Sequence, residues 1–273
     1  MEGCVSPASK IRVNDMEMAY RIHGHGPPLI MIMGFSGTMD LWDPAMLDAL
    51  SARFTVIVFD NRGMGGTTAG EKDFSIERFA DDTAEFMDAL QISHAFVLGW
   101  SMGTEVALEL ALRHPRKVDK LVLYAADCSM KAFPPSHDVL EKLYDTSGTP
   151  QERGKREFGL MFPPEWLKTH GEYLQKIFSR STETSLPRNI KRQGDAMENW
   201  KGCCDRLHQM RVETLLITGT EDVLTPPQNS YWMADRIPGA SLVKFENGGH
   251  GVMYQFPEKF SETVIKFLED HLK

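Results

Sequence analysis

The pentapeptide Gly99-Trp100-Ser101-Met102-Gly103 decides how the rest of the sequence is interpreted. It follows the apolar run His94 to Leu98 and precedes the segment Thr104 to Arg113, which has the composition of a helix. An apolar run of strand type, a Gly-x-Ser-x-Gly motif and a helical segment, in this order, predict a strand, a sharp turn and a helix. Ser101 is therefore expected at the apex of the turn.

Crowding at this turn explains the two glycines. The strand and helix backbones approach the apex so closely that a Cβ atom at Gly99 or Gly103 would collide with them. We expect Ser101 to have strained backbone geometry that lifts its hydroxyl clear of the sheet, at the positive end of the helix. The alternative is a glycine-rich turn in which the serine is incidental. The flanking pattern and the partners described below favour a nucleophile.

Length and composition indicate a globular α/β protein that acts on a small molecule. The chain has 273 residues, which suits one large domain or a domain that carries an insertion. Its hydrophobic fraction of 42% and charged fraction of 25% are ordinary for a globular protein. The net charge of -8, without clusters of Lys and Arg, argues against a nucleic-acid partner.

The sequence predicts a cytoplasmic protein without a membrane partner. It contains no apolar stretch long enough to cross a bilayer, and its first residues lack the basic and apolar regions of a signal peptide. The four cysteines, Cys4, Cys128, Cys203 and Cys204, do not suggest a disulfide framework, and adjacent cysteines have poor geometry for bridging each other. Because no Cys/His spacing of zinc type is present, we do not expect a bound metal. We expect no cofactor either.

Apolar runs alternate with helical segments along most of the chain. This order predicts a mostly parallel, doubly wound sheet covered by helices on both faces, with the function at the carboxyl ends of its strands. Strands are expected in Ile11 to His23 (a strand or hairpin), Leu29 to Met33, Phe54 to Phe59, His94 to Leu98, Val118 to Ala126, Val212 to Gly219 and Ser241 to Phe245. Helices are expected in Asp40 to Arg53, Ser75 to Leu90, Thr104 to Arg113, Gln228 to Arg236 and Pro257 to Leu272.

The stretch from Met130 to Met210 has a different character. It contains no strand-like run, only short amphipathic segments interrupted by prolines. We interpret residues 130–210 as a helical cap inserted into an α/β core formed by residues 1–129 and 211–273. The Phe, Met and Trp side chains of the cap are expected to bury it on the core, with two or three of them lining a substrate pocket.

A serine hydroxyl needs a general base and an orienting carboxylate to act as a nucleophile at neutral pH. His250 is the best candidate for the base, because it follows the last predicted strand within the glycine cluster Gly248 to Gly251. Asp222 and Asp127 both follow predicted strands and compete for the role of the acid. Asp222 is favoured, because a Gly-x-x-Asp turn directs its side chain over the sheet edge toward a histidine from the adjoining strand.

The oxyanion of a tetrahedral intermediate requires two hydrogen-bond donors from the backbone. One is expected from Met102, the residue that follows the nucleophile. The other is expected from the loop after the first buried strand, at Phe35. Either side chain can also belong to the core.

The sequence as a whole resembles the α/β-hydrolase fold superfamily. The turn Gly99 to Gly103, the segment Asp60 to Gly65, the segment Gly219 to Asp222 and Gly249-His250 match its landmarks in order. Ser101-Met102-Gly103 and Phe35 are similar to the branch of esterases and cofactor-free haloperoxidases, which implies carboxylesterase activity. The His-Gly that usually precedes the oxyanion loop is Met33-Gly34 here, so the fine structure of that loop differs from the family pattern.

The leading hypothesis is a serine hydrolase that cleaves a small carboxylic ester or lactone through an acyl-enzyme on Ser101. One alternative is a hydrolase-fold receptor that binds a small molecule with little turnover. Another is a carbon–carbon bond hydrolase or an aminopeptidase. Because Ser101 replaces the nucleophilic aspartate of haloalkane dehalogenases and epoxide hydrolases, those activities are disfavoured. The sequence leaves the physiological substrate open, and also whether the chain forms a homo-oligomer.

Overall fold

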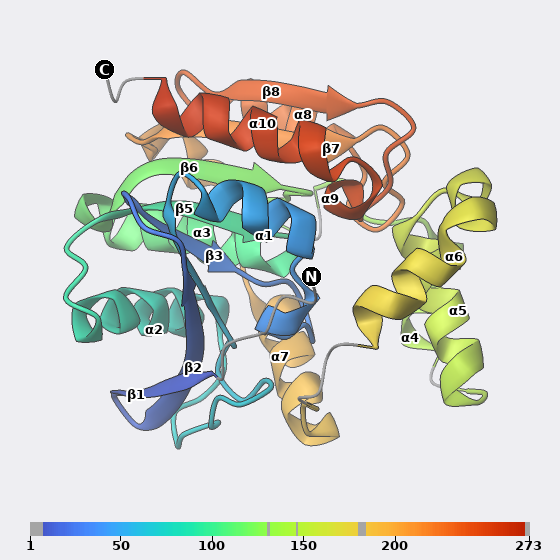
Figure 1. Cartoon of the computed structure of the whole chain (residues 1–273), viewed down its shortest axis with the longest axis horizontal. Helices are drawn as coiled ribbons and strands as arrows, with labels where there is room; N and C mark the ends of the chain where they lie inside the picture. Colours follow the sequence, from blue (N-terminus) through green and yellow to red (C-terminus); the bar gives the residue numbers. More distant parts are fainter. Residues whose placement is uncertain (1–7, 130–131, 146, 180–183, 271–273) are drawn as a thin grey trace.

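An eight-stranded sheet forms the centre of the computed structural model, which describes residues 8–129, 132–145, 147–179 and 184–270 (Figure 1). The strand order is β1-β2-β4-β3-β5-β6-β7-β8; β2 runs antiparallel to its two neighbours, and the strands from β4 to β8 in this order are parallel. The strands are β1 (Ser9–Val13), β2 (Met16–His23), β3 (Pro28–Ile32), β4 (Thr55–Phe59), β5 (Ala95–Trp100), β6 (Val118–Tyr124), β7 (Glu213–Gly219) and β8 (Ser241–Phe245). The predicted fold class, a mostly parallel sheet flanked by helices, is confirmed.

Helices cover both faces of the sheet. They are α1 (Pro44–Ser51), α2 (Ile76–Ala89), α3 (Met102–Arg113), α4 (His137–Tyr144), α5 (Pro150–Met161), α6 (Pro164–Phe178), α7 (Pro187–Asn199), α8 (Gln228–Ala234), α9 (Val252–Gln255) and α10 (Pro257–Glu269), with 3-10 turns η1 (Met39–Leu41), η2 (Pro115–Lys117) and η3 (Cys204–Gln209). The helix predicted from residue 40 to 53 is divided, because Asp43 caps α1 and Pro44 is its first residue.

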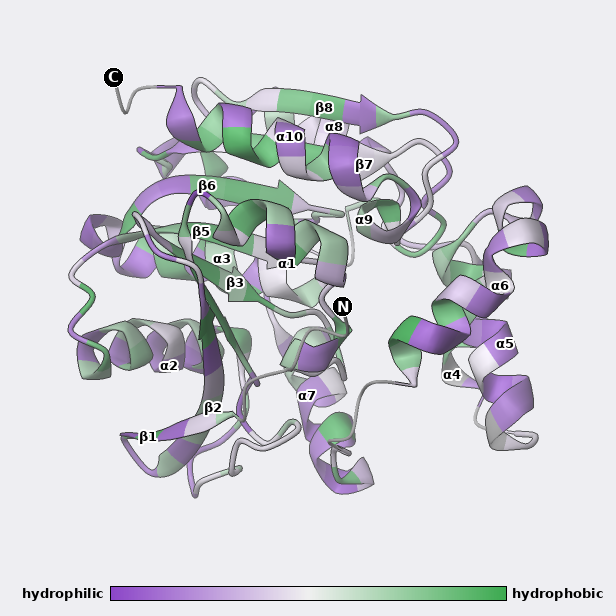
Figure 2. Ribbon diagram, viewed as in Figure 1, coloured by the Kyte–Doolittle hydropathy of each residue, from purple (hydrophilic) through white to green (hydrophobic). Residues whose placement is uncertain are grey.

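The core consists of two apolar layers, one on each face of the sheet. One layer packs α2, α3 and α8 against the strands, and the other packs α1, α9 and α10. Strand β5 is buried along its whole length, which explains its unbroken run of apolar side chains and Gly99. Figure 2 shows hydrophobic residues along β6 and mainly hydrophilic residues on α5.

The segment between β6 and β7 is helical, as the sequence predicts. Its described residues contain no strand and form α4, α5, α6, α7 and η3. Figure 1 shows α4, α5 and α6 grouped beyond the carboxyl ends of the parallel strands, whereas α7 lies apart from them, close to the core. Leu174 and Ile177 of α6 and Phe162 belong to the same buried layer as α1 and α10, so this segment packs on the core through apolar side chains.

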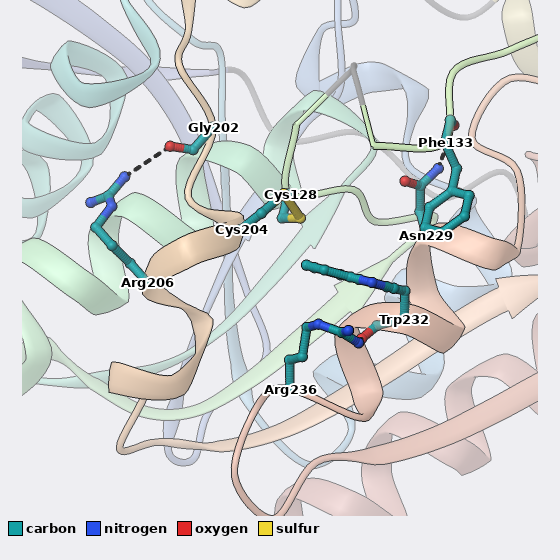
Figure 3. The surroundings of a disulfide bond; sticks show 8 residues. All are labelled: Cys128, Phe133, Gly202, Cys204, Arg206, Asn229, Trp232 and Arg236. Atoms are coloured by element: carbon teal, nitrogen blue, oxygen red, sulfur yellow. Dashed lines mark hydrogen bonds between the residues drawn. A yellow bond between two sulfur atoms is a disulfide. The ribbon is translucent and has the colours of Figure 1, made fainter.

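The structure corrects the expectation about the cysteines, because Cys128 and Cys204 form a disulfide. Their separation of 76 residues in sequence gives no hint of this pairing. The fold brings the partners together, since Cys128 follows β6 and Cys204 begins η3, at the two ends of the helical segment (Figure 3). Cys203 is a buried free thiol, and burial raises the pKa of this thiol well above its ordinary value.

No helix among the described residues is long and apolar enough to cross a membrane.

Arg62 anchors the turn after β4 to the hairpin of β1 and β2. It is 1% exposed and makes paired hydrogen bonds with Asp82 of α2, both 2.7 Å, and with Asp15 of the hairpin, 3.0 and 3.2 Å. Burial on its own would raise the pKa of Asp15, but the hydrogen bonds from Arg62 and from two backbone N–H groups outweigh burial and hold this pKa well below its usual range. The cation therefore neutralises two carboxylates, one of them buried.

We predict that Arg62→Met lowers the free energy of unfolding by about 3–5 kcal/mol, because the buried Asp82 loses both hydrogen bonds that it accepts from Arg62 and keeps only the more distant Arg78, 3.9 Å away. Urea denaturation measures the loss. The matched control is Arg113→Met, which removes an arginine that also makes paired bonds with a carboxylate, Asp81, but whose side chain is 40% exposed. Its expected cost is about 1 kcal/mol or less. Equal losses in the two variants would contradict the role given to Arg62.

We predict that Cys204→Ala lowers the free energy of unfolding by about 2–4 kcal/mol, because the bridge closes a long loop and so restricts the unfolded chain. Non-reducing peptide mapping of the wild-type protein is expected to yield a cross-linked pair of peptides that contain Cys128 and Cys204. Recovery of both peptides in the alkylated, unlinked form from protein purified without reductant would show that the bridge does not form.

Candidate active site

Ser101 lies at the strained turn between β5 and α3. Its backbone angles, φ 55° and ψ −124°, are unfavourable for a residue with a side chain. A Cβ atom at Gly99 would lie 2.3 Å from the carbonyl oxygen of Gly103, and one at Gly103 would lie 2.1 Å from that of Ile32. The predicted crowding is confirmed, and it explains why both positions need glycine.

His250 is paired with Asp222. The Nδ1 atom of His250 lies 2.9 Å from Oδ2 of Asp222, and both residues are at least 95% buried. The second oxygen of Asp222, Oδ1, accepts hydrogen bonds from the backbone N–H groups of Leu224 (2.9 Å) and Thr225 (2.8 Å). The carboxylate is thus held by its own turn and presents its free oxygen to the imidazole.

The backbone of His250 is docked on the strands next to Ser101. Its carbonyl oxygen accepts hydrogen bonds from the indole N–H of Trp100, 3.3 Å away, and from the hydroxyl of Tyr124. Burial raises the pKa of Tyr124 well above its usual value, so its hydroxyl stays protonated and can donate. The rings of Trp100 and His250 lie 5.7 Å apart. Because Trp100 directly precedes Ser101, these contacts bring the imidazole to the end of β5.

The helical segment also contacts the His250 loop. The backbone N–H of Gly251 donates to the carbonyl oxygen of Met161 at the end of α5, at 3.1 Å. A Cβ atom at Gly251 would lie 2.2 Å from the ring of Phe162, so the loop and this ring are in direct contact. The position of the histidine therefore depends partly on a segment outside the sheet and its covering helices.

The loop after β3 lies against Ser101. A Cβ atom at Gly34 would be 3.2 Å from the Cβ of Ser101. The N–H groups of Ser36 and Gly37 are engaged, with the side chain of Gln193 (2.7 Å) and the carbonyl of Gly34 (3.3 Å) respectively. The N–H of Phe35 therefore stays a candidate donor of this loop, and the Phe35 side chain is 38% exposed.

Met102 supplies the second candidate donor. It is the first residue of α3, where a backbone N–H has no partner within the helix. Its side chain is 1% exposed and belongs to the core. The backbone and the side chain of Met102 can thus serve different purposes, as the sequence analysis allowed.

Asp127, the competing carboxylate, has another partner. It follows β6 and pairs with Glu105, which is 1% exposed and lies in the first turn of α3. Burial raises the pKa of Asp127 to about 6, although a hydrogen bond with Glu105 and the charge of His250 lower it. Burial, together with the charge and hydrogen bond of Asp127, raises the pKa of Glu105 well above its usual value. Asp222, rather than Asp127, makes the recorded hydrogen bond to His250.

Sequence reasoning missed Glu105 and Gln193. Glu105 lies one helical turn after Ser101 in a mainly apolar helix, and an acidic residue at this position is a detectable signal. The contact of Gln193 with Ser36 spans 157 residues and leaves no local signal.

A further group, His137, Asp138 and Glu141 on α4, has the geometry of metal ligands, but all three side chains are exposed.

Comparison with known proteins places these features in a family. The family model described as alpha/beta hydrolase fold matches residues 27–257. The chain belongs to the α/β-hydrolase fold family. Among relatives of this α/β hydrolase, a protein of Azorhizobium caulinodans named "Putative carbamate hydrolase RutD" is 28% identical, with 93% of this chain and 95% of the relative covered.

Solved structures of α/β hydrolases have the same architecture. An alpha/beta hydrolase fold protein from Chitinophaga pinensis is 27% identical with a TM-score of 0.83, and the match covers 97% of this chain and 98% of that one. A hydrolase from Pseudomonas aeruginosa PA01 is 25% identical with a TM-score of 0.82, covering 97% and 99% respectively. The similarity extends through the helical segment as well as the sheet.

We predict that Asp127→Asn becomes more stable relative to the wild-type protein as the pH rises from 4.5 to 7.5. A raised carboxyl pKa means that ionisation is penalised in the folded state. Ionisation of Asp127 therefore lowers the stability of the wild-type protein as the pH rises from about 4 to about 6, and an amide removes this contribution because it does not ionise. The expected relative change is on the order of 2 kcal/mol by urea denaturation.

The exposed Asp48 provides the control, as Asp48→Asn, for the loss of a carboxyl group at the surface. A stability difference between Asp127→Asn and the wild-type protein that is the same at both pH values would contradict the protonation assigned to this pair.

Proposed function

We propose that this α/β hydrolase is a serine hydrolase that cleaves a small carboxylic ester or lactone through an acyl-enzyme on Ser101. In this proposal His250 is the general base, Asp222 orients the imidazole and stabilises its protonated form, and the N–H groups of Phe35 and Met102 form the oxyanion hole. The observation that carries the proposal is the 2.9 Å hydrogen bond between Asp222 and His250, on a loop docked beside the strained turn that presents Ser101.

In the first half of the reaction, Nε2 of His250 removes the hydroxyl proton of Ser101 while Oγ forms a bond to the carbonyl carbon of the substrate. The carbonyl oxygen becomes an oxyanion and accepts hydrogen bonds from Phe35 and Met102. When the intermediate collapses, the bond to the leaving alcohol breaks, and His250 returns its proton to the leaving oxygen. A water molecule then repeats the sequence on the acyl-enzyme and releases the acid and free Ser101.

The electrostatics of the site suit these steps. Nδ1 of His250 is engaged by Asp222, so Nε2 is the nitrogen available to take the serine proton. Asp222 is 3% exposed, and its three hydrogen bonds, two from backbone N–H groups and one with Nδ1 of His250, hold the carboxylate in place beside the imidazole. The N-terminus of α3 lies directly after Ser101 and contributes positive potential where the oxyanion develops.

We propose that residues 130–210 act as a cap over the carboxyl ends of the strands, with residues 1–129 and 211–273 as the core. The position of α4, α5 and α6 beyond these strand ends supports this assignment (Figure 1). The aromatic side chains of Phe158, Phe162, Trp166 and Phe178 pack on one another and on the core layer. An apolar acyl or alcohol group therefore fits the surroundings better than a highly charged one.

A carbamate is a second candidate substrate class. The relatives of this chain that are named for carbamate hydrolysis support it. A carbamate carbonyl is attacked by the same geometry, so the proposed machinery applies to it unchanged. A panel of p-nitrophenyl acetate, p-nitrophenyl butyrate, a γ-lactone and an N-alkyl p-nitrophenyl carbamate compares these classes, with kcat/KM as the measure of preference.

We predict that a fluorophosphonate labels Ser101 of the wild-type protein and that Ser101→Ala abolishes labelling. This variant is expected to lower kcat for p-nitrophenyl butyrate by at least about 10³-fold, because it removes the nucleophile. Its thermal unfolding midpoint should stay close to that of the wild-type protein. The control is Ser241→Ala, which removes an exposed hydroxyl at the start of β8 and is expected to keep wild-type labelling and turnover. Turnover retained in Ser101→Ala would exclude the proposed mechanism, and tight ligand binding without turnover in the wild-type protein would favour a receptor.

A further inference from the structure

Helix α7 lies against the two elements that would supply the oxyanion donors. Its inward face carries Asn189 and Gln193, one helical turn apart, and its last turn is followed by Trp200; all three are at least 95% buried. Each of these side chains makes a hydrogen bond to a part of the core that lies far away in the sequence. In Figure 1, α7 is accordingly placed beside the core and apart from α4, α5 and α6.

The first contact fixes the loop that contains Phe35. The amide oxygen Oε1 of Gln193 accepts the backbone N–H of Ser36 at 2.7 Å. Ser36 has a positive φ of 58°, an unfavourable conformation for serine that requires support from its surroundings. Because Phe35 and Ser36 are adjacent, this hydrogen bond determines the orientation of the peptide groups next to the Phe35 N–H. The ring of Phe35 also approaches α7, within 3.5 Å of a Cβ atom placed at Gly194.

A second contact fixes the helix that begins with Met102. The indole N–H of Trp200 donates to the carboxylate of Glu109 at 3.0 Å, and Arg206 donates to the same carboxylate. Glu109 is fully buried in α3. The elements that carry both proposed oxyanion donors are therefore held by hydrogen bonds from α7 and the residue that follows it. The Phe35 loop is held through Ser36, and Met102 is held through α3.

Burying the amide of Gln193 costs more free energy than burying an apolar side chain of the same size. Gln193 is 0% exposed, and its Nε2 atom has no hydrogen-bond partner among the described residues. A buried donor without an acceptor is destabilising, and methionine has a similar length and shape without that penalty. The benefit of glutamine at this position must come from its oxygen, whose partner is the Ser36 N–H.

We propose that Gln193 is a positioning residue for the oxyanion hole, through which the helical segment takes part in catalysis. Its oxygen holds Ser36, and Ser36 in turn sets the direction of the Phe35 N–H toward the developing negative charge. This role rests on the proposed function. Since substrate binding does not need the oxyanion donor in its final position, loss of the Gln193 oxygen affects kcat rather than KM.

The test compares Gln193→Met with Asn189→Leu. Asn189 lies one turn earlier on the same face and donates to the carbonyl of Gly63 at 3.0 Å, so its loss also removes a buried hydrogen bond between α7 and the core. With p-nitrophenyl butyrate, Gln193→Met is expected to lower kcat by about 10- to 100-fold, somewhat less than deletion of an oxyanion donor, with KM changed by less than about 3-fold. Asn189→Leu is expected to keep kcat within about 2-fold of the wild-type value.

A tetrahedral inhibitor supplies the readout that a purely structural role would not move. The inhibition constant of an alkyl trifluoromethyl ketone is expected to rise in Gln193→Met by the same factor by which kcat/KM falls, and to stay unchanged in Asn189→Leu. The folded fraction of each variant is measured by circular dichroism, and kcat is calculated per folded protein. Gln193→Leu serves as a second variant if Gln193→Met does not fold. Wild-type kcat and inhibitor affinity in the Gln193 variants, or equal losses in the Asn189 variant, would overturn the proposal.

Failure of the underlying function is distinguishable from failure of this inference. A wild-type protein that hydrolyses no ester and is not labelled by a fluorophosphonate would refute the serine hydrolase, and with it the role of Gln193. An active wild-type protein whose Gln193→Met variant is equally active refutes only the role of Gln193.

Discussion

The strained backbone of Ser101 is the constraint on which the rest of the site depends. A residue with a side chain is held at φ 55° between β5 and α3, with the carbonyl oxygens of Ile32 and Gly103 packed against the flanking glycines. Such a conformation costs on the order of 1–3 kcal/mol, and it persists because buried strands on both sides leave the turn no room to relax. The loop after β3 lies against Ser101, and the His250 loop is docked on Trp100, the residue before it.

Buried polar contacts then fix the groups around this turn. Asp222 is oriented by its own turn and orients His250, while Trp100 and Tyr124 hold the backbone carbonyl of His250. On the other side, α7 links the loop after β3 to α3 through Gln193 and Trp200. Segments that are remote in sequence are thus connected around this turn, and the helical segment takes part through α7.

Much of the fold and part of the site are predictable from the sequence, because they depend on local patterns. The unbroken apolar runs of β3, β5 and β7 predict buried parallel strands, and the glycines around Ser101 predict a crowded turn. Contacts between distant segments are not predictable in this way. Asp127 and Asp222 both follow strands; the Gly-x-x-Asp turn favours Asp222 in the sequence, but its hydrogen bond to His250 is seen only in the structure. The pairing of Cys128 with Cys204 likewise exists only once β6 and η3 are in place. The same holds for Gln193, which looks like an ordinary polar residue of an amphipathic helix.

The proposed mechanism requires that Ser101 carries the acyl group during turnover. The most direct measurement is mass spectrometry of the enzyme, acid-quenched while it hydrolyses p-nitrophenyl butyrate, followed by peptide mapping. The proposed mechanism predicts one butyryl group on the peptide that contains Ser101, and none in Ser101→Ala. Ester hydrolysis without any acylated peptide, or with the acyl group on another residue, would contradict it.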